Sequence, residues 1–203
     1  MEKTGILGGT FDPVHNAHLM IAREAQAAAG LDSVLFMPAG IPPNKAGSPM
    51  AAPEHRLAMV RLAIRGKRGF AVSDREIKSP NVDYTADTLL ALHEDKPGSR
   101  LYFIAGGDSL LYLDKWHKPA QLLSLAVFVA VYRPGSSLAE LEHKRKEIMA
   151  RFGGEILLVP CAGMDISSTE IRRRVAAGLD ISSLVPKPVE AYIKLYGLYK
   201  ESA

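Results

Sequence analysis

The sequence predicts a Rossmann-like, doubly wound α/β fold, in which helices cover both faces of a mostly parallel sheet. Two observations support this fold class: short apolar runs alternate with helical patterns along the chain, and glycines stand where several helices should end. Such alternation favours parallel strands, because each helix carries the chain back to the same end of the sheet. No repeat, low-complexity tract or linker divides the sequence, so we expect one domain over residues 1–203.

Six short apolar runs are the predicted strands. They are Thr4–Leu7, Val34–Met37, Phe70–Val72, Leu101–Ala105, Ala126–Val131 and Ile156–Val159. Six longer segments have helical patterns, namely Asn16–Ala29, Glu54–Ile64, Thr85–Glu94, Leu138–Phe152, Ser168–Ala177 and Pro188–Leu195. Gly30, Gly66 and Gly178 follow three of these helices as stop signals. The longest apolar run, Leu122 to Val131, is too short to cross a bilayer, and we interpret it as a buried strand.

The composition limits the possible classes of protein. A hydrophobic content of 47% in 203 residues indicates a folded globular chain, and a net charge of +3 is too small to favour nucleic acid as a partner. The single cysteine, Cys161, excludes an internal disulfide and fits a reducing compartment. The phosphate motif described next begins so early that we expect no signal peptide. We therefore expect a cytoplasmic protein without a membrane partner, and a homo-oligomer is possible.

The turn after the first predicted strand is the most informative stretch of the sequence. It reads Gly8-Gly9-Thr10-Phe11-Asp12-Pro13-Val14-His15-Asn16-Ala17-His18. Glycines let a ligand approach the backbone closely, and the helix that follows directs its free N–H groups and its positive dipole end at the turn. His15 and His18 should lie on one face of the first helical turn, where both rings could reach one anion. The pattern predicts a polyphosphate site at the carboxyl end of the first strand, where ligands bind in open parallel sheets.

Other glycine-rich and histidine motifs fit this turn less well. The dinucleotide fingerprint needs slim residues where Phe11 and Pro13 stand, and no Gly-Lys-Ser/Thr follows to make a Walker A loop. A zinc site is disfavoured, because the spacing of His15 and His18 differs from His-Glu-x-x-His and Cys161 is distant in sequence. A plain structural turn with two surface histidines is the remaining alternative.

A second candidate phosphate element begins at Ile166 and continues into a predicted helix. Ser167 and Glu170 have the spacing of a capping box, which by itself would explain the local pattern. Arg172, however, should share one helix face with Ser168 and Thr169, so that hydroxyls, a helix N-terminus and a guanidinium converge. Such a group suits a leaving pyrophosphate. Arg173 and Arg174 are expected to be surface charges.

Three further residues have a functional and a structural interpretation. Asp108 follows the glycines of another strand end and could bind a ribose hydroxyl or cap a helix. Trp116 could stack on a flat ring or belong to the core. Lys45 follows two prolines that stiffen its loop, and it could bind a ligand or point into solvent.

These motifs resemble those of a known superfamily. The Gly8–His18 turn and Ile166-Ser167-Ser168-Thr169 with Arg172 are similar to the two signature motifs of the nucleotidyltransferases, and the nucleotidyltransferase fold is therefore expected. Further blocks resemble the bacterial nicotinate-nucleotide adenylyltransferase family over most of the chain. They are Pro42-Pro43-Asn44-Lys45, Arg56-Leu57-Ala58-Met59, Asp83-Tyr84-Thr85-Ala86-Asp87-Thr88-Leu89, Gly106-Gly107-Asp108 with Trp116, and Arg133-Pro134-Gly135.

The resemblance implies a reaction and a set of roles. The family transfers the adenylyl group of ATP to nicotinate mononucleotide in NAD biosynthesis. It implies catalytic roles for His15, His18 and Arg172, and ATP binding by Gly8, Gly9, Thr10, Phe11, Gly106, Asp108, Ser168 and Thr169. It also implies that Lys45, Thr85, Trp116 and Arg133 bind the mononucleotide. Mg²⁺ is expected to arrive with ATP, held by phosphates and water, with no metal site on the protein.

Two departures from the family pattern stand in these blocks, since Ala17 replaces the usual glycine and Asn44 the usual histidine. Asn44 cannot carry charge, which bears on mononucleotide affinity more than on the type of reaction. Three alternative functions stay open at this point: adenylyl transfer to nicotinamide mononucleotide, transfer to phosphopantetheine, and nucleotide binding by a regulator without catalysis.

Overall fold

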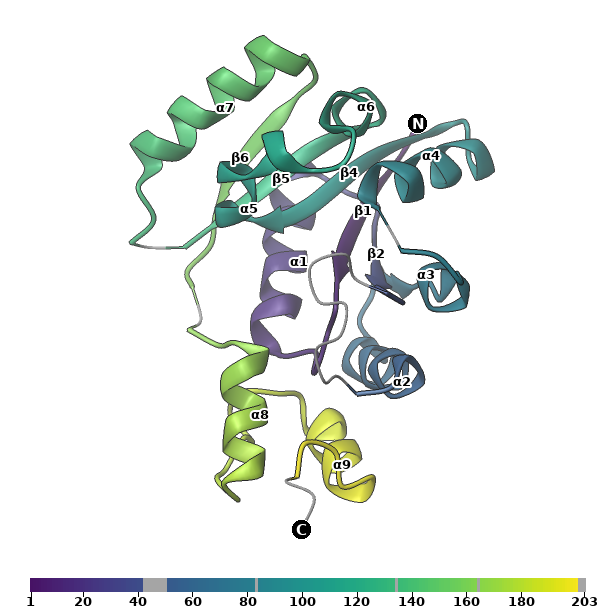
Figure 1. Ribbon diagram of the computed structural model, residues 1–203, viewed down its shortest axis with the longest axis vertical. Helices are drawn as coiled ribbons and strands as arrows, with labels where there is room; N and C mark the ends of the chain where they lie inside the picture. Colours follow the sequence, from purple (N-terminus) through teal and green to yellow (C-terminus); the bar gives the residue numbers. More distant parts are fainter. Residues whose placement is uncertain (42–50, 83, 134, 164, 201–203) are drawn as a thin grey trace.

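The computed structural model describes residues 1–41, 51–82, 84–133, 135–163 and 165–200. In these ranges one sheet contains six strands, all parallel, in the spatial order β3-β2-β1-β4-β5-β6 (Figure 1). The strands are β1 (Glu2–Gly9), β2 (Ser33–Pro38), β3 (Phe70–Val72), β4 (Ser99–Gly106), β5 (Ala126–Tyr132) and β6 (Ile156–Pro160). This is the strand order of a doubly wound nucleotide-binding sheet, which confirms the predicted fold class.

Helices connect the strands throughout the described ranges. They are α1 (Asn16–Ala29), α2 (Pro53–Ile64), α3 (Arg75–Lys78), α4 (Thr85–Asp95), α5 (Gly107–Leu111), α6 (Pro119–Leu125), α7 (Leu138–Phe152), α8 (Ser168–Ala176) and α9 (Lys187–Leu195), with a 3₁₀ turn η1 (Leu113–Lys115). All six predicted helices are present with ends that agree within one residue. The short helices α3, α5 and α6 and the η1 turn are additions that the sequence pattern did not indicate. No described helix is both long and apolar enough to cross a membrane.

The interpretation of Leu122 to Val131 as one strand is wrong. The run is divided between α6, which ends at Leu125, and β5, which begins at Ala126. Pro119 in the first turn of α6 suits a helix start, and Leu122 and Leu123 are buried against the second core described below. The shorter strand predicted over Ala126–Val131 begins where β5 begins, whereas a continuous apolar run has no periodicity that would show its first residues to be helical.

Two hydrophobic cores lie on opposite faces of the sheet, because successive strand residues point to opposite sides. One core joins strand residues such as Leu7, Ile104 and Val129 to buried residues of α1, α2 and α9. The other joins Ile6 and Phe128, among others, to buried residues of α4, α6 and α7. Burial on both faces explains why the strands read as continuous apolar runs rather than as alternating ones.

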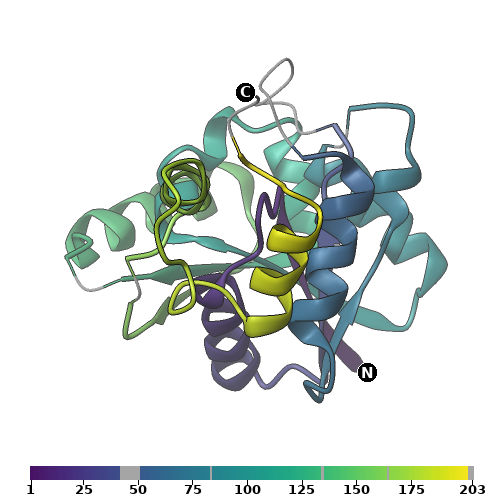
Figure 2. The same cartoon turned by 90° about the horizontal axis from the view of Figure 1, so that it is seen from below.

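The sheet has its topological switch point between β1 and β4. The chain leaves β1 toward β2 on one side, whereas β4 pairs with β1 on the other side. A crevice at the carboxyl ends of these two strands is the usual ligand site of such sheets. Figure 2 shows α8 and α9 side by side at this end of the molecule, close to the chain that follows β1.

Candidate active site

The glycine-rich turn continues directly from β1, which extends through Gly8 and Gly9. Phe11 adopts a left-handed backbone conformation (φ 50°), and its ring folds into the core, where it is 2% exposed. A Cβ on Gly9 would lie 3.2 Å from that ring, so a larger residue there would displace the ring by a few tenths of an ångström. The side chain of Phe11 thus anchors the turn, and what this residue offers to a ligand is its backbone.

His15 and His18 meet at the start of α1, as the sequence predicts. Their rings stack with centroids 3.7 Å apart, and the backbone N–H of His15 donates to Nδ1 of His18 over 3.2 Å. Because Nδ1 of His18 accepts this bond, the proton of a neutral His18 ring resides on Nε2. Burial lowers the pKa of His15 to about 4, so this ring is uncharged at neutral pH. The pair therefore offers N–H donors and polar rings rather than two positive charges.

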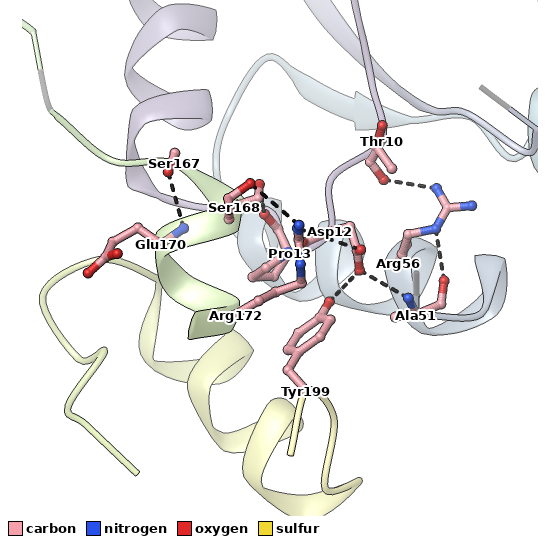
Figure 3. Close-up of polar contacts among 11 residues, drawn as sticks. Thr10, Asp12, Pro13, Ala51, Arg56, Ser167, Ser168, Glu170, Arg172 and Tyr199 are labelled. Carbon is pink, nitrogen blue, oxygen red and sulfur yellow. Dashed lines mark hydrogen bonds and ion pairs between the residues drawn. The ribbon is translucent and has the colours of Figure 1, made fainter. Parts of the chain in front are cut away.

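The second phosphate element docks onto this turn from the far end of the sequence (Figure 3). Arg172 Nη1 donates to the carbonyl oxygen of Asp12 over 2.7 Å, and Ser168 Oγ donates to the carbonyl oxygen of Pro13 over 3.0 Å. Arg172 Nη2 also reaches Thr169 Oγ1 at 3.4 Å. The two motifs, about 150 residues apart in sequence, thus form one structural unit.

The remaining residues of α8 are arranged around its cap. Ser167 Oγ accepts the backbone N–H of Glu170 over 3.2 Å, which is one half of the predicted capping box. The Glu170 carboxylate instead accepts bonds from Arg173 and Arg174, and these lower its pKa to about 2. Arg173 and Arg174 therefore form ion pairs with Glu170 on the surface of α8. Of the three arginines, Arg172 is the one that contacts the turn.

A cavity of about 420 Å³ opens beside the Gly8–His18 turn, which is called the phosphate turn below. Part of the cavity wall is aromatic. Its lining includes Gly8, Gly9, Thr10, Thr85 and Trp116, together with Glu76, Tyr84 and His117. The Trp116 ring forms T-shaped contacts with Phe103 and Phe128, with centroid distances of 5.9 and 6.1 Å. Trp116 therefore packs against the core and also lines the cavity, and its stacking on a ligand ring stays a prediction.

Three further predicted site residues line neither this cavity nor the Gly8–His18 turn. Gly106 ends β4 and caps α5, and Asp108 is exposed in the first turn of that helix. Arg133 follows β5, has half of its side chain exposed and lies 3.6 Å from Asp165. All three stand at the carboxyl ends of β4 and β5. Lys45 lies outside the described residues.

Comparisons with known proteins decide the family. Residues 6–174 match the family model described as Cytidylyltransferase-like. The chain is 40% identical over 203 residues to a probable nicotinate-nucleotide adenylyltransferase of Thermomicrobium roseum, covering 98% of this chain and 92% of that one. It is 45% identical to the protein of the same name from Roseiflexus sp., with 97% of each chain covered. The chain belongs to the nicotinate-nucleotide adenylyltransferase family.

Solved structures agree with this family at the level of the fold. A Plasmodium falciparum nicotinic acid mononucleotide adenylyltransferase complexed with NaAD superposes with a TM-score of 0.78 at 20% identity, with 98% of both chains covered. A putative nicotinate-nucleotide adenylyltransferase of Vibrio parahaemolyticus gives 0.69 at 22% identity, covering 100% of this chain and 98% of the other. The nucleotidyltransferase-like α/β fold predicted from the two motifs is therefore confirmed.

Three residues whose roles no sequence pattern indicated hold the Gly8–His18 turn in place. Asp12 is 2% exposed, and its Oδ1 accepts the Tyr199 hydroxyl over 2.6 Å. Arg56 is 1% exposed, and its Nη1 donates to the carbonyl oxygens of Thr10 and Ala39 over 2.8 and 2.6 Å. Arg56 stands beside Leu57 and Met59 in an apolar helix face, a position that could have marked it as a buried charge. Nothing in the sequence around Tyr199 signalled its contact with residue 12.

Metal ligands are sparse in the part of the chain that the structure describes. In these ranges no group of three or more histidine, cysteine, aspartate or glutamate side chains could hold a metal ion.

Proposed function

We infer that the protein transfers the adenylyl group of ATP to nicotinate mononucleotide, which yields nicotinate adenine dinucleotide and pyrophosphate for NAD biosynthesis. Membership of the family over nearly the whole chain supports this reaction. The structural observation that carries it is the bond between Arg172 and the Asp12 carbonyl, which brings the second motif to the histidine turn. This contact supports a single triphosphate site served by both motifs.

The phosphate turn would bind ATP. Backbone groups of Gly8, Gly9, Thr10 and Phe11 would surround the nucleotide, with Gly106 and Asp108 on its adenosine side. His18 would direct its Nε2–H at the α-phosphoryl group, with His15 as a neutral neighbour. Ser168, Thr169 and Arg172 would take the departing pyrophosphate, where a helix N-terminus and a guanidinium favour an anion.

The aromatic cavity would bind the acceptor. Thr85 opens α4, whose N-terminus favours a negatively charged group, and the Trp116 face suits a flat pyridine ring. Arg133 and Lys45 would approach the phosphate of the mononucleotide. The cavity shares Gly8, Gly9 and Thr10 with the phosphate turn, so the two substrates would meet at the end of β1.

The chemistry would need alignment and charge neutralisation rather than a general base. The attacking phosphate monoester has a second pKa of about 6 and is mostly dianionic at neutral pH. The transition state gains charge on the α-phosphoryl and leaving oxygens, which fixed donors such as His18 and Arg172 would stabilise. Mg²⁺ bound together with ATP would neutralise part of the same charge. We also propose a cytoplasmic location, and a homo-oligomer stays a prediction.

Pyrophosphate release from ATP tests the function with three acceptors in parallel: nicotinate mononucleotide, nicotinamide mononucleotide and phosphopantetheine. We expect release with nicotinate mononucleotide, in equal amounts with the dinucleotide product and with the highest kcat/KM of the three. Faster release with either other acceptor would replace the proposed substrate. Nucleotide binding without release in any reaction would point to a regulator that lacks the chemistry.

A further inference from the structure

We propose that Tyr199 is a positioning residue for adenylyl transfer, because its hydroxyl holds the Asp12 carboxylate and so leaves Arg172 available for ATP phosphates. The proposal rests on the function inferred above and adds a residue to which no motif assigns a role. It also means that the segment after α9 contributes a residue that supports the site.

Asp12 is the junction at which three distant segments meet the phosphate turn (Figure 3). Its Oδ1 accepts two hydrogen bonds, from the Ala51 backbone N–H over 3.2 Å and from the Tyr199 hydroxyl over 2.6 Å. Its backbone carbonyl oxygen accepts the bond from Arg172. The carboxylate and the carbonyl that binds Arg172 thus belong to the same residue. A change in the bonds of the carboxylate would therefore also alter the contact with Arg172.

The charges around Asp12 make Arg172 the cation that can be displaced. Asp12 Oδ2 has no hydrogen-bond partner among the described residues, and Arg172 Nη1 lies 3.8 Å from it. The positive charge of Arg56 also acts on Asp12. The Arg56 guanidinium, however, is fully buried and donates to four carbonyl oxygens, those of Thr10, Ala39, Gly40 and Ala51. Arg172 keeps 30% of its side chain exposed and has room to move.

The turn after α9, residues 196–199, positions the Tyr199 hydroxyl next to Asp12. After α9, Gly197 takes a left-handed conformation (φ 61°), and the Leu198 N–H closes the turn on the Ile193 carbonyl over 3.1 Å. Tyr199 is itself left-handed (φ 65°), which is costly for a bulky residue and persists only where other contacts hold it. Burial raises the pKa of Tyr199 well above its usual value, so the hydroxyl keeps its proton and stays a donor.

Loss of this hydroxyl should affect one substrate more than the other. With one donor fewer, the buried carboxylate would draw on the nearest adaptable donor, the Arg172 guanidinium, because unmet buried acceptors are costly. Arg172 would then be less available for ATP. The acceptor cavity with Thr85 and Trp116 does not include Tyr199, Asp12 or Arg172 in its lining, so mononucleotide binding should be preserved.

The test compares Tyr199→Phe with Tyr192→Phe, a matched control. Tyr192 lies on α9, and its hydroxyl is 2.9 Å from His55 Nδ1, away from the turn. We expect Tyr199→Phe to raise KM for ATP by about 5- to 10-fold and to lower kcat, which is the size of effect typical of one net hydrogen bond. KM for nicotinate mononucleotide should change less than twofold, and Tyr192→Phe should change neither constant.

A double-mutant cycle with Asp12→Asn locates the effect. If Tyr199 acts through the Asp12 charge, adding Tyr199→Phe to Asp12→Asn should leave KM for ATP nearly unchanged. Equal effects in both backgrounds, equal changes in both KM values, or a Tyr199→Phe chain that does not fold would overturn the proposal and make Tyr199 merely structural. Calorimetric titration with a non-hydrolysable ATP analogue repeats the comparison without turnover, so it can fail or succeed separately from the proposed reaction.

Discussion

The phosphate turn and the aromatic cavity share the end of β1, yet they are built in opposite ways. The turn is held by long-range hydrogen bonds that involve the buried Asp12 and Arg56 and the half-buried Tyr199. The outer wall of the cavity includes Tyr84 and His117, whose ring centroids are 4.2 Å apart and which are both more than a third exposed. Buried bonds thus fix the turn, whereas this outer wall of the cavity is held by a contact at the surface.

This difference suggests a division of labour. Groups that stabilise a transition state must be fixed before the reaction, because reorganisation would consume the electrostatic gain. Groups that recognise a flat acceptor can adapt, since apolar stacking tolerates small displacements. Changes in the turn should therefore affect kcat, KM for ATP or folding, and changes in the cavity wall should affect KM for the acceptor.

Replacement of His18 should give the largest effect and tests whether the turn controls kcat. We expect His18→Asn to lower kcat by ~10²-fold, the typical effect of one lost transition-state donor. The Asn side chain can still accept the His15 backbone N–H at the position of Nδ1, so the turn should persist, while the Nε2–H is lost. Steady-state kinetics and thermal unfolding of the same preparation measure both effects.

His18→Gln is the matched control, because its amide nitrogen can stand near the position of Nε2. It should retain more activity than His18→Asn, and both variants should keep KM for nicotinate mononucleotide close to that of the unmodified chain. A His18→Asn enzyme with near-normal kcat would contradict the role given to Nε2.

The contrast between the regions also explains what could be predicted from the sequence. The strands and longer helices were readable because each carries its own apolar pattern, and Gly8 to His18 carries local turn chemistry. The bonds that join Asp12 to Tyr199 and Arg172 to the Asp12 carbonyl depend on residues 187 and 160 positions apart. No local pattern encodes such distances; the resemblance of the motifs supplied the pairing of Arg172 with the turn, and nothing supplied Tyr199.

A smaller effect should appear in the pH dependence of folding. His15 has its pKa lowered from 6.5 to about 4 by burial in the folded chain. The unfolded chain thus binds more protons below pH 6.5, so this residue makes the free energy of unfolding fall as pH drops from 6.5 toward 4. Between pH 7 and pH 5 the loss is about 2 kcal/mol.

His15→Asn isolates this contribution, because asparagine is a good helix N-cap and does not titrate. Urea unfolding at pH 7 and pH 5 should show a fall in stability for the unmodified chain that exceeds that of the variant by the amount given above. Parallel pH profiles would mean that His15 is solvated and charged, and the turn would then resemble the cavity in its exposure.

The smallest expected effect concerns the cavity. It tests whether the cavity wall controls KM for the acceptor and leaves kcat unchanged. Trp116→Ala should raise KM for nicotinate mononucleotide by roughly 10-fold, because a lost aromatic pair costs about 1 kcal/mol beyond the buried area. KM for ATP and kcat should change less than twofold. Trp116→Phe should restore most of the affinity while leaving the contacts with Phe103 and Phe128 partly in place. If Trp116→Ala instead changes both KM values equally, the ring serves the core alone, and the acceptor must be recognised by other residues of the wall.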